Sequence, residues 1–162
     1  MTVGDGREVG TEQPGRYDRV LVDAPCTGLG ALRRRPEARW RRQPEDLTAL
    51  APLQRALLAS AAAAVRPGGV VVYATCSPHL AETRFVVQDV LRRHPELGVE
   101  DVRPLLRDRH GDPVPATGQG PWAQLWPHRH DTDGMFVALL RRQDGRPQTH
   151  SASEAPRRSD AR

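Results

Sequence analysis

Two short apolar runs, each followed by a turn that contains a cysteine, constrain the fold of this chain more than any other feature. Val20-Leu21-Val22 leads into Asp23-Ala24-Pro25-Cys26, and Val70-Val71-Val72-Tyr73 leads into Ala74-Thr75-Cys76-Ser77-Pro78. Apolar runs rich in β-branched residues and bounded by Pro or Gly are typical of short buried strands. Ligands of open α/β sheets bind at the carboxyl ends of the strands. The pattern therefore predicts that two thiols and the Asp23 carboxylate meet at one edge of one sheet.

The order of the remaining segments predicts an α/β sheet that is parallel in its first half. Strands are expected over 20–23 and 69–76, and helical spacing of apolar residues predicts helices over 44–65 and 79–94. Pro67-Gly68-Gly69 is expected to stop the first helix. Further strands are expected over 99–106, 122–126 and 135–140, with a loop over 107–120. The domain is expected to cover 1–142, and the Ser-, Pro- and Arg-rich stretch 143–162 to be a disordered tail.

The strand over 20–23 needs more neighbours than the chain before it can supply. It is apolar on both faces and so needs a strand on each side, but the residues before it are few and contain Gly and Pro. An uncovered strand of this kind exposes a row of backbone groups that pair readily with other chains. We therefore expect the chain to be the C-terminal half of a domain whose first strands are missing.

Charge favours a polyanionic partner, although weakly. The chain has 24 basic side chains against 20 acidic ones, for a net charge of +4. Arg33, Arg34 and Arg35 precede Trp40 in an Arg-rich segment that suits RNA phosphates and a stacked base. A solvated basic helix face explains the same residues equally well. Two cysteines, no apolar stretch judged long enough to span a bilayer and no export signal at the N-terminus predict a cytoplasmic protein.

The two cysteines suggest nucleophilic chemistry when they are taken together. Either one alone would more often be a small core residue. Two thiols and a carboxyl group suit conjugate addition to a pyrimidine: one thiol adds to C6 of cytosine, and the carboxyl group hydrogen-bonds the N3/N4 edge. C5 then accepts an electrophilic methyl group, and the second thiol helps to remove the C5 proton and expel the first. The residues alone do not say which thiol attacks.

Two other chemistries are less well supported. His128 and His130 lie near acidic residues, but no further ligand shows a metal-site spacing, so we expect no metal. A thiol-based redox protein would need two cysteines close in space, and the chain has no Cys-x-x-Cys pair.

Four segments together carry a resemblance to a known family. They are Asp23 to Gly30, Arg33 to Glu37 with Trp40, Tyr73 to Ser77, and Leu125 to Phe136. These segments closely resemble those of the RNA cytosine-C5 methyltransferases of the Nol/Nop/Sun family. Within it, they are most similar to the bacterial Sun/Fmu type, which acts on small-subunit ribosomal RNA. Glu82 fits the family's Glu after the nucleophile, whereas Thr83 stands in place of its usual Asn.

The resemblance implies a Rossmann-like methyltransferase sheet that uses S-adenosylmethionine, of which this chain is the C-terminal half. Cys76 would attack C6 and Cys26 would assist proton removal and product release. Asp23 would hold the cytosine edge, and Pro25 would shape the turn beside it. Asp5 and Asp23 would contact the cofactor, Asp5 at its adenine. The family's Gly-rich cofactor loop and the acidic residue for the cofactor's ribose are absent from this chain.

The expected function is methyl transfer from S-adenosylmethionine to C5 of cytosine in small-subunit ribosomal RNA, through a covalent cysteine adduct. The alternative is a catalytically incomplete fragment that retains an RNA-facing surface and weak RNA binding. We expect the chain by itself to be inactive. Its expected partners are ribosomal RNA and a missing N-terminal half of the same protein.

Overall fold

The strands form one mixed sheet in the order β1-β2-β5-β3, with β4 paired to β5. In the computed structural model, which describes residues 3–144, β1 (Tyr17–Asp23) and β2 (Val65–Thr75) are parallel. The last strand, β5 (Phe136–Arg142), runs antiparallel to β2, to β3 (Leu97–Glu100) and to the short β4 (Ala123–Gln124). The predicted α/β sheet with a parallel first half is thus confirmed.

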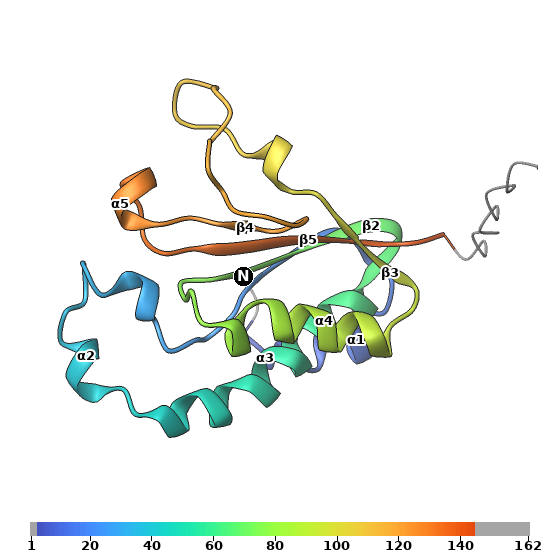
Figure 1. The fold of residues 1–162 in the computed structure, drawn as a ribbon. Coiled ribbons are helices and arrows are strands. Elements are labelled where there is room, and N and C mark those ends of the chain that lie inside the picture. Colours follow the sequence, from blue (N-terminus) through green and yellow to red (C-terminus); the bar gives the residue numbers. More distant parts are fainter. Residues whose placement is uncertain (1–2, 145–162) are drawn as a thin grey trace, which may run out of the picture.

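Helices α1 (Val9–Glu12), α3 (Pro44–Ala64) and α4 (Arg84–Arg93) lie on the same side of the sheet, as Figure 1 shows. Two further short helices are α2 (Ala38–Arg41) and α5 (Pro127–His130), and the 3-10 turns are η1 (Leu29–Ala31), η2 (Leu80–Glu82) and η3 (Arg103–Leu105). A capping box between Gln43 and Asp46, with proline in the first turn, fixes the start of α3. This helix ends where β2 begins, so the chain enters the sheet directly from its longest helix.

The main core lies between this helical layer and the sheet. Its largest fully buried side chains include Leu58 of α3, Tyr73 of β2, and Phe136 and Leu140 of β5. A smaller cluster of Val102, Ala123 and Leu139 covers part of the opposite face. Near β1 that face is open, because Leu21 is 69% exposed. Within residues 3–144 no strand pairs with the outer edge of β1, so this edge presents unpaired backbone groups beside an apolar side chain.

The helix α3 is, by length and composition alone, apolar enough to cross a membrane, contrary to the expectation that no stretch of the chain is. It packs against α1, α4, β1 and β2, and its Leu58, Ala61, Ala62 and Ala64 are buried. These contacts explain its apolar composition, because a helix that is covered on several sides by its own domain needs few polar residues.

Several element boundaries differ from those predicted. The helix predicted over 79–94 is broken at Thr83, whose backbone (φ −122°, ψ −102°) is not helical and whose hydroxyl donates to the His79 carbonyl at 2.9 Å. The first long helix ends at Ala64 rather than at Pro67-Gly68-Gly69. These three residues instead lie within β2 at a shift of the β1–β2 register: Tyr17 pairs with Val65, but Arg19, two residues later, pairs with Val70.

Two of the three predicted C-terminal strands are shorter than expected, whereas the strand predicted over 135–140 is found over Phe136–Arg142. The strand predicted over 99–106 ends at Glu100, because proline within η3 cannot donate to a ladder. The strand predicted over 122–126 is two residues long, because the Trp126 N–H donates to the His130 ring within the turn of α5. The Gln143 N–H donates to the Glu96 carbonyl at 2.8 Å, and the rest of the predicted tail, 145–162, lies outside the described residues.

Candidate active site

Both cysteines come directly after strands that end side by side. Asp23 pairs with Ala74 at the last position of the β1–β2 ladder, and the Ala24 N–H donates to the Ala74 carbonyl at 3.0 Å. The two turns therefore leave the sheet at the same edge, and the Sγ atoms of Cys26 and Cys76 are 3.4 Å apart. This separation is within hydrogen-bonding range for sulfur, and both residues are free thiols. The predicted meeting of the two thiols is confirmed.

The thiols open into a cavity of about 800 Å³. Asp23 also lines the cavity and is exposed, and no ion pair involves it among the residues from 3 to 144. The polar wall opposite carries guanidinium groups from the segment after Cys26. The residues that line the cavity include Pro25, Thr27, Gly28, Arg34, Arg35, Glu37, Arg41, Arg42, Asp133 and Met135.

The Cys26 thiol is held in its protonated form. Burial, together with the hydrogen bond to Cys76, raises the pKa of Cys26 to about 12. Cys26 is therefore a thiol at neutral pH and can donate its S–H to the Cys76 sulfur. A protonated thiol beside a second sulfur is suited to donate or exchange a proton rather than to attack.

A buried carboxylate anchors the turn that carries Cys26. Thr27 donates to Glu82 twice, from its backbone N–H at 2.8 Å and from its hydroxyl at 2.5 Å. The Gln54 side-chain amide donates to the Pro25 carbonyl at 2.8 Å and to Glu82 at 3.2 Å. Gln54 was missed in the sequence, although a fully buried glutamine on the apolar face of α3 is a signal for such a link.

Two glycines bring the segment before β5 against the turn that follows Cys26. The Gly30 N–H donates to the Cys76 carbonyl at 2.9 Å, and the Gly134 N–H donates to the Gly30 carbonyl at 2.8 Å. A Cβ atom on Gly30 would lie 2.1 Å from the Gly134 carbonyl oxygen and 2.9 Å from that of Cys76. Only glycine fits between these two backbone segments.

Gly30→Ala is therefore expected to lower the free energy of unfolding by about 1–3 kcal/mol, because rigid backbone on both sides cannot move away from the added methyl group. Urea unfolding measures the loss. Gly4→Ala is the matched control, because a Cβ at Gly4 meets nothing within 4 Å and should leave the unfolding midpoint unchanged. Equal midpoints for the two variants would contradict the close approach.

The arginines predicted to bind RNA have different surroundings. Arg34 forms a bidentate ion pair with the buried Asp133, and the Arg34 guanidinium holds the pKa of Asp133 below its usual range. Arg33 pairs with Asp131 at 2.8 Å and does not line the cavity. Arg35 lines the cavity without an ion-pair partner among the described residues. Two of the three predicted RNA contacts are thus occupied by acids of the C-terminal segment.

Other predicted site residues lie outside the cavity. Trp40 is 82% exposed on α2, whereas its neighbours Arg41 and Arg42 line the cavity. Asp5 is exposed near the N-terminal end, where hydrogen bonds from Arg7 lower its pKa to about 2. Residues 3–144 contain no group of three or more His, Cys, Asp or Glu side chains that could hold a metal ion.

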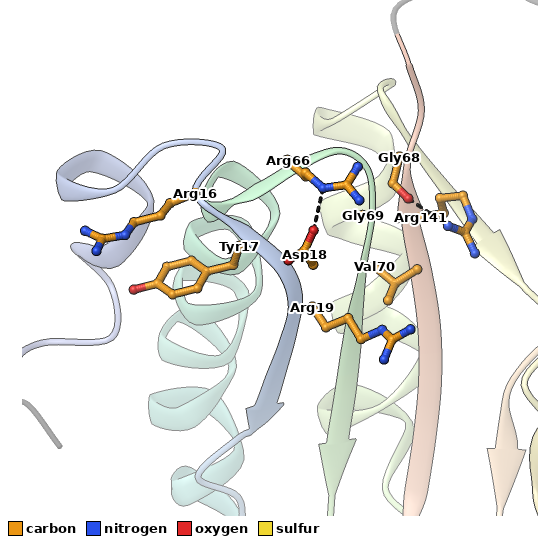
Figure 2. A pocket seen from close by; sticks show the side chains of 9 residues that line it. All are labelled: Arg16, Tyr17, Asp18, Arg19, Arg66, Gly68, Gly69, Val70 and Arg141. Atoms are coloured by element: carbon orange, nitrogen blue, oxygen red, sulfur yellow. Dashed lines mark hydrogen bonds and ion pairs between the residues drawn. The ribbon is translucent and has the colours of Figure 1, made fainter.

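A second cavity, of about 710 Å³, lies at the other end of these strands, at the amino ends of β1 and β2 (Figure 2). It is lined by residues near the start of β1 and β2, including Arg16, Arg19 and Arg66, and by Arg141 near the end of β5. Arg66 pairs with Asp18 at 2.6 Å, and Arg141 donates to the Gly68 carbonyl at 2.7 Å. No thiol lines it and it lies away from the carboxyl ends of β1 and β2, so the cysteine cavity is the candidate active site.

Comparison with known proteins gives a consistent set of relatives. A profile of the family described as 16S rRNA methyltransferase RsmB/F matches residues 1–141. The putative methyltransferase Rv1407 of Mycobacterium tuberculosis is 66% identical over 139 residues, which are 85% of this chain and 29% of that protein. The mitochondrial tRNA (cytosine(34)-C(5))-methyltransferase of Danio rerio is 43% identical over 150 residues, 88% of this chain and 40% of that protein.

Solved structures agree with these sequences. NSun6 from Pyrococcus horikoshii, crystallised with SFG, an analogue of S-adenosylmethionine, has a TM-score of 0.70 at 30% identity, covering 88% of this chain and 34% of that one. The mixed sheet is therefore that of a Rossmann-like methyltransferase, as predicted. The chain spans between 29% and 40% of the length of these three relatives.

Proposed function

The chain belongs to the 16S rRNA methyltransferase RsmB/F family, and on that premise we propose that the protein methylates C5 of a cytosine in small-subunit ribosomal RNA. The methyl donor is S-adenosylmethionine, and the reaction passes through a covalent cysteine adduct. The observation that carries the proposal is the pair of thiols 3.4 Å apart in a cavity that a strand-end carboxylate also lines. Because the substrate is ribosomal RNA, we place the reaction in the cytoplasm.

The cavity is suited in charge to the proposed cofactor. S-adenosylmethionine supplies an electrophilic methyl group on a sulfonium ion and also carries an ammonium group. Asp23 is an exposed carboxylate that no described arginine neutralises, whereas Asp133 in the same cavity is neutralised by Arg34. Asp23, which lies at the end of β1 beside the thiols, is therefore proposed to contact the cationic cofactor, and Asp5 is proposed to accept a hydrogen bond from the adenine. The Gly-rich cofactor loop is proposed to come from a further part of the protein, absent from this chain.

Cys76 is proposed as the nucleophile. Its sulfur forms a bond to C6 of the cytosine, and the electron pair of the C5–C6 double bond moves toward the ring's N3 edge and makes C5 nucleophilic. The Asp23 carboxyl group hydrogen-bonds the N3/N4 edge, where the charge develops, and Pro25 shapes the turn next to it. After methyl transfer, C5 loses its proton, the double bond re-forms, and the Cys76 sulfur leaves. The target base must be unstacked to reach the cavity.

Cys26 is proposed to act in this last stage. Its raised pKa keeps its proton at neutral pH, and its sulfur lies within hydrogen-bonding distance of the sulfur that must leave. The Cys26 S–H is proposed to pass its proton to the departing Cys76 sulfur as the C6–S bond breaks, and the Cys26 thiolate so formed is proposed to take up the proton that C5 loses, so that both cysteines end as thiols. The two thiols are therefore proposed to have separate roles, attack for Cys76 and release for Cys26.

The exposed arginines of the cavity wall, with Arg33 and Arg34, are proposed to contact RNA phosphates, and Trp40 is proposed to stack on a base. Arg35→Ala and Arg41→Ala are expected to weaken RNA binding, each lowering the slope of log K against log salt by about 0.7, because each removes one phosphate contact. Filter binding over a salt series measures the slope. Arg93→Ala, an exposed position at the far end of α4, should leave it unchanged. Identical slopes for all three variants would contradict the proposed RNA path.

The function is tested on the native protein, isolated from its source cells and first measured for intact mass, which shows how much sequence accompanies this chain. The protein is incubated with unmethylated small-subunit ribosomal RNA and methyl-labelled S-adenosylmethionine, and the RNA is digested to nucleosides. We expect the label in 5-methylcytidine. Label in another nucleoside, or none from a protein of the relatives' length, would refute the proposal.

A further inference from the structure

Glu82 is an unusual residue for the interior of this domain. It is fully buried, and no arginine or histidine forms an ion pair with it among residues 3–144. The other buried acid, Asp133, has Arg34 as a partner. A buried carboxylate without a cation is costly unless hydrogen bonds replace its lost hydration. Glu82 meets this need with three side-chain hydrogen bonds, two of them from Thr27 and one from Gln54.

The position of Glu82 links the two cysteine-bearing turns. Its side chain holds Thr27, the residue directly after Cys26. Its backbone is tied to the other strand, because the Tyr73 hydroxyl donates to the Glu82 carbonyl at 2.8 Å and the Glu82 N–H donates to the His79 carbonyl at 3.0 Å. Tyr73 lies three residues before Cys76 on β2. Glu82 therefore connects the two cysteines: its side chain is hydrogen-bonded to the residue after Cys26, and its backbone is hydrogen-bonded to Tyr73 on the strand that leads to Cys76.

The two hydrogen bonds between Glu82 and Thr27 restrict the orientation of Thr27 as well as its distance from Glu82. Both oxygens of the carboxylate are used on one residue, so Thr27 can neither move away nor rotate without losing a short hydrogen bond. Gln54 holds the preceding carbonyl, that of Pro25, so Cys26 is fixed from both sides. Apolar side chains of similar size would serve a purely structural contact at least as well, because buried polar networks rarely add net stability over good packing.

We propose that Glu82 is a positioning residue that holds the Cys26 thiol within reach of the Cys76 sulfur. The inference rests on the proposed function for its catalytic meaning, since it is through Cys26 that Glu82 would affect product release. The break of the helix at Thr83 belongs to the same arrangement, because η2 presents Glu82 to the Cys26 turn before α4 begins.

The first experiment measures thiol proximity and does not depend on catalysis. Dibromobimane, a bifunctional thiol reagent, becomes strongly fluorescent when both its arms have reacted, so its rate of cross-linking reports how often the two sulfurs are adjacent. Glu82→Gln places an amide group against the donors of Thr27 and Gln54. We expect it to slow cross-linking about tenfold, the equivalent of one lost charge-assisted hydrogen bond.

Two comparisons separate positioning from general loss of stability. Ser60→Ala is the matched control, because it removes another buried hydrogen bond, from the Gly10 N–H at 2.9 Å, on the part of α3 that packs against α1. It should leave cross-linking unchanged. Thr27→Val removes the hydroxyl that binds Glu82 and should slow cross-linking, whereas Thr27→Ser keeps it and should not. The threonine pair keeps the proposal testable even where Glu82→Gln fails to fold.

The second experiment measures accumulation of the covalent protein–RNA adduct, a signal that a misfolded variant would not give. If Glu82 positions Cys26, the native protein with Glu82→Gln should accumulate covalent protein–RNA adduct, detected as a band resistant to denaturing gel electrophoresis. Slower cross-linking without methylation by any variant would support the positioning role and refute the proposed function. Normal cross-linking and no adduct in Glu82→Gln and Thr27→Val, from a protein that methylates RNA, would overturn the inference.

Discussion

Cys76→Ala is expected to abolish RNA methylation, lowering kcat by about 10⁴-fold or more, the scale seen when a covalent nucleophile is removed. Without the Cys76 sulfur no bond forms to C6, and C5 of the cytosine remains too weak a nucleophile to accept a methyl group. Single-turnover methylation with labelled S-adenosylmethionine measures the loss. RNA affinity should be unchanged, because the Cys76 sulfur is proposed to act in the chemical steps, whereas the arginines of the cavity wall are proposed to bind the phosphates.

Cys76→Ser provides the accompanying control. Serine preserves the size of the side chain and a donor beside the Cys26 sulfur, so the cavity retains its shape, but a hydroxyl is a far weaker nucleophile than a thiolate. It should therefore be as inactive as the alanine variant while unfolding at the same denaturant concentration as the wild type. Methylation retained at wild-type level in either variant would show that Cys76 is not the nucleophile.

The sequence predicts the position of the two cysteines at the carboxyl ends of β1 and β2 well, because this position depends on local sequence patterns. Apolar β-branched runs ended by Pro-Cys and Cys-Ser-Pro turns specify both the ends of the strands and the thiols placed just beyond them. The approach of Cys26 and Cys76 is then a consequence of the parallel pairing of β1 and β2. The long helix α3 is predicted by equally local signals, since its proline, its acidic first turn and its apolar spacing all lie within one segment.

The features that the sequence did not predict depend on contacts between distant segments. Glu82 ends a 3-10 turn instead of continuing a helix, and its carboxylate accepts a hydrogen bond from Thr27, 55 residues earlier. The pairing of Arg34 with Asp133, 99 residues later, was not predicted either. The contact between Gly30 and Gly134 likewise gives no signal in either local sequence. Such pairings form only once the sheet has brought the segments together.

Cys26→Ala is expected to have a different effect from Cys76→Ala: it should trap the enzyme on its substrate. Cys76 would still add to C6 and C5 would still accept the methyl group, but the S–H that lies 3.4 Å from the Cys76 sulfur would be missing when that sulfur has to leave. Turnover should fall by about 10²–10⁴-fold, the usual contribution of general acid–base catalysis. The covalent protein–RNA complex should then persist through denaturing gel electrophoresis.

This result would separate the two thiols in a way that activity alone does not, because both alanine variants lose turnover and only one of them holds the RNA. The double variant, with both cysteines replaced, should form no adduct, since formation of the bond precedes its release. Adduct formed by Cys76→Ala and not by Cys26→Ala would reverse the assignment. That reversal would make Cys26 the nucleophile and Cys76 the thiol that assists release, since each sulfur lies within hydrogen-bonding distance of the other.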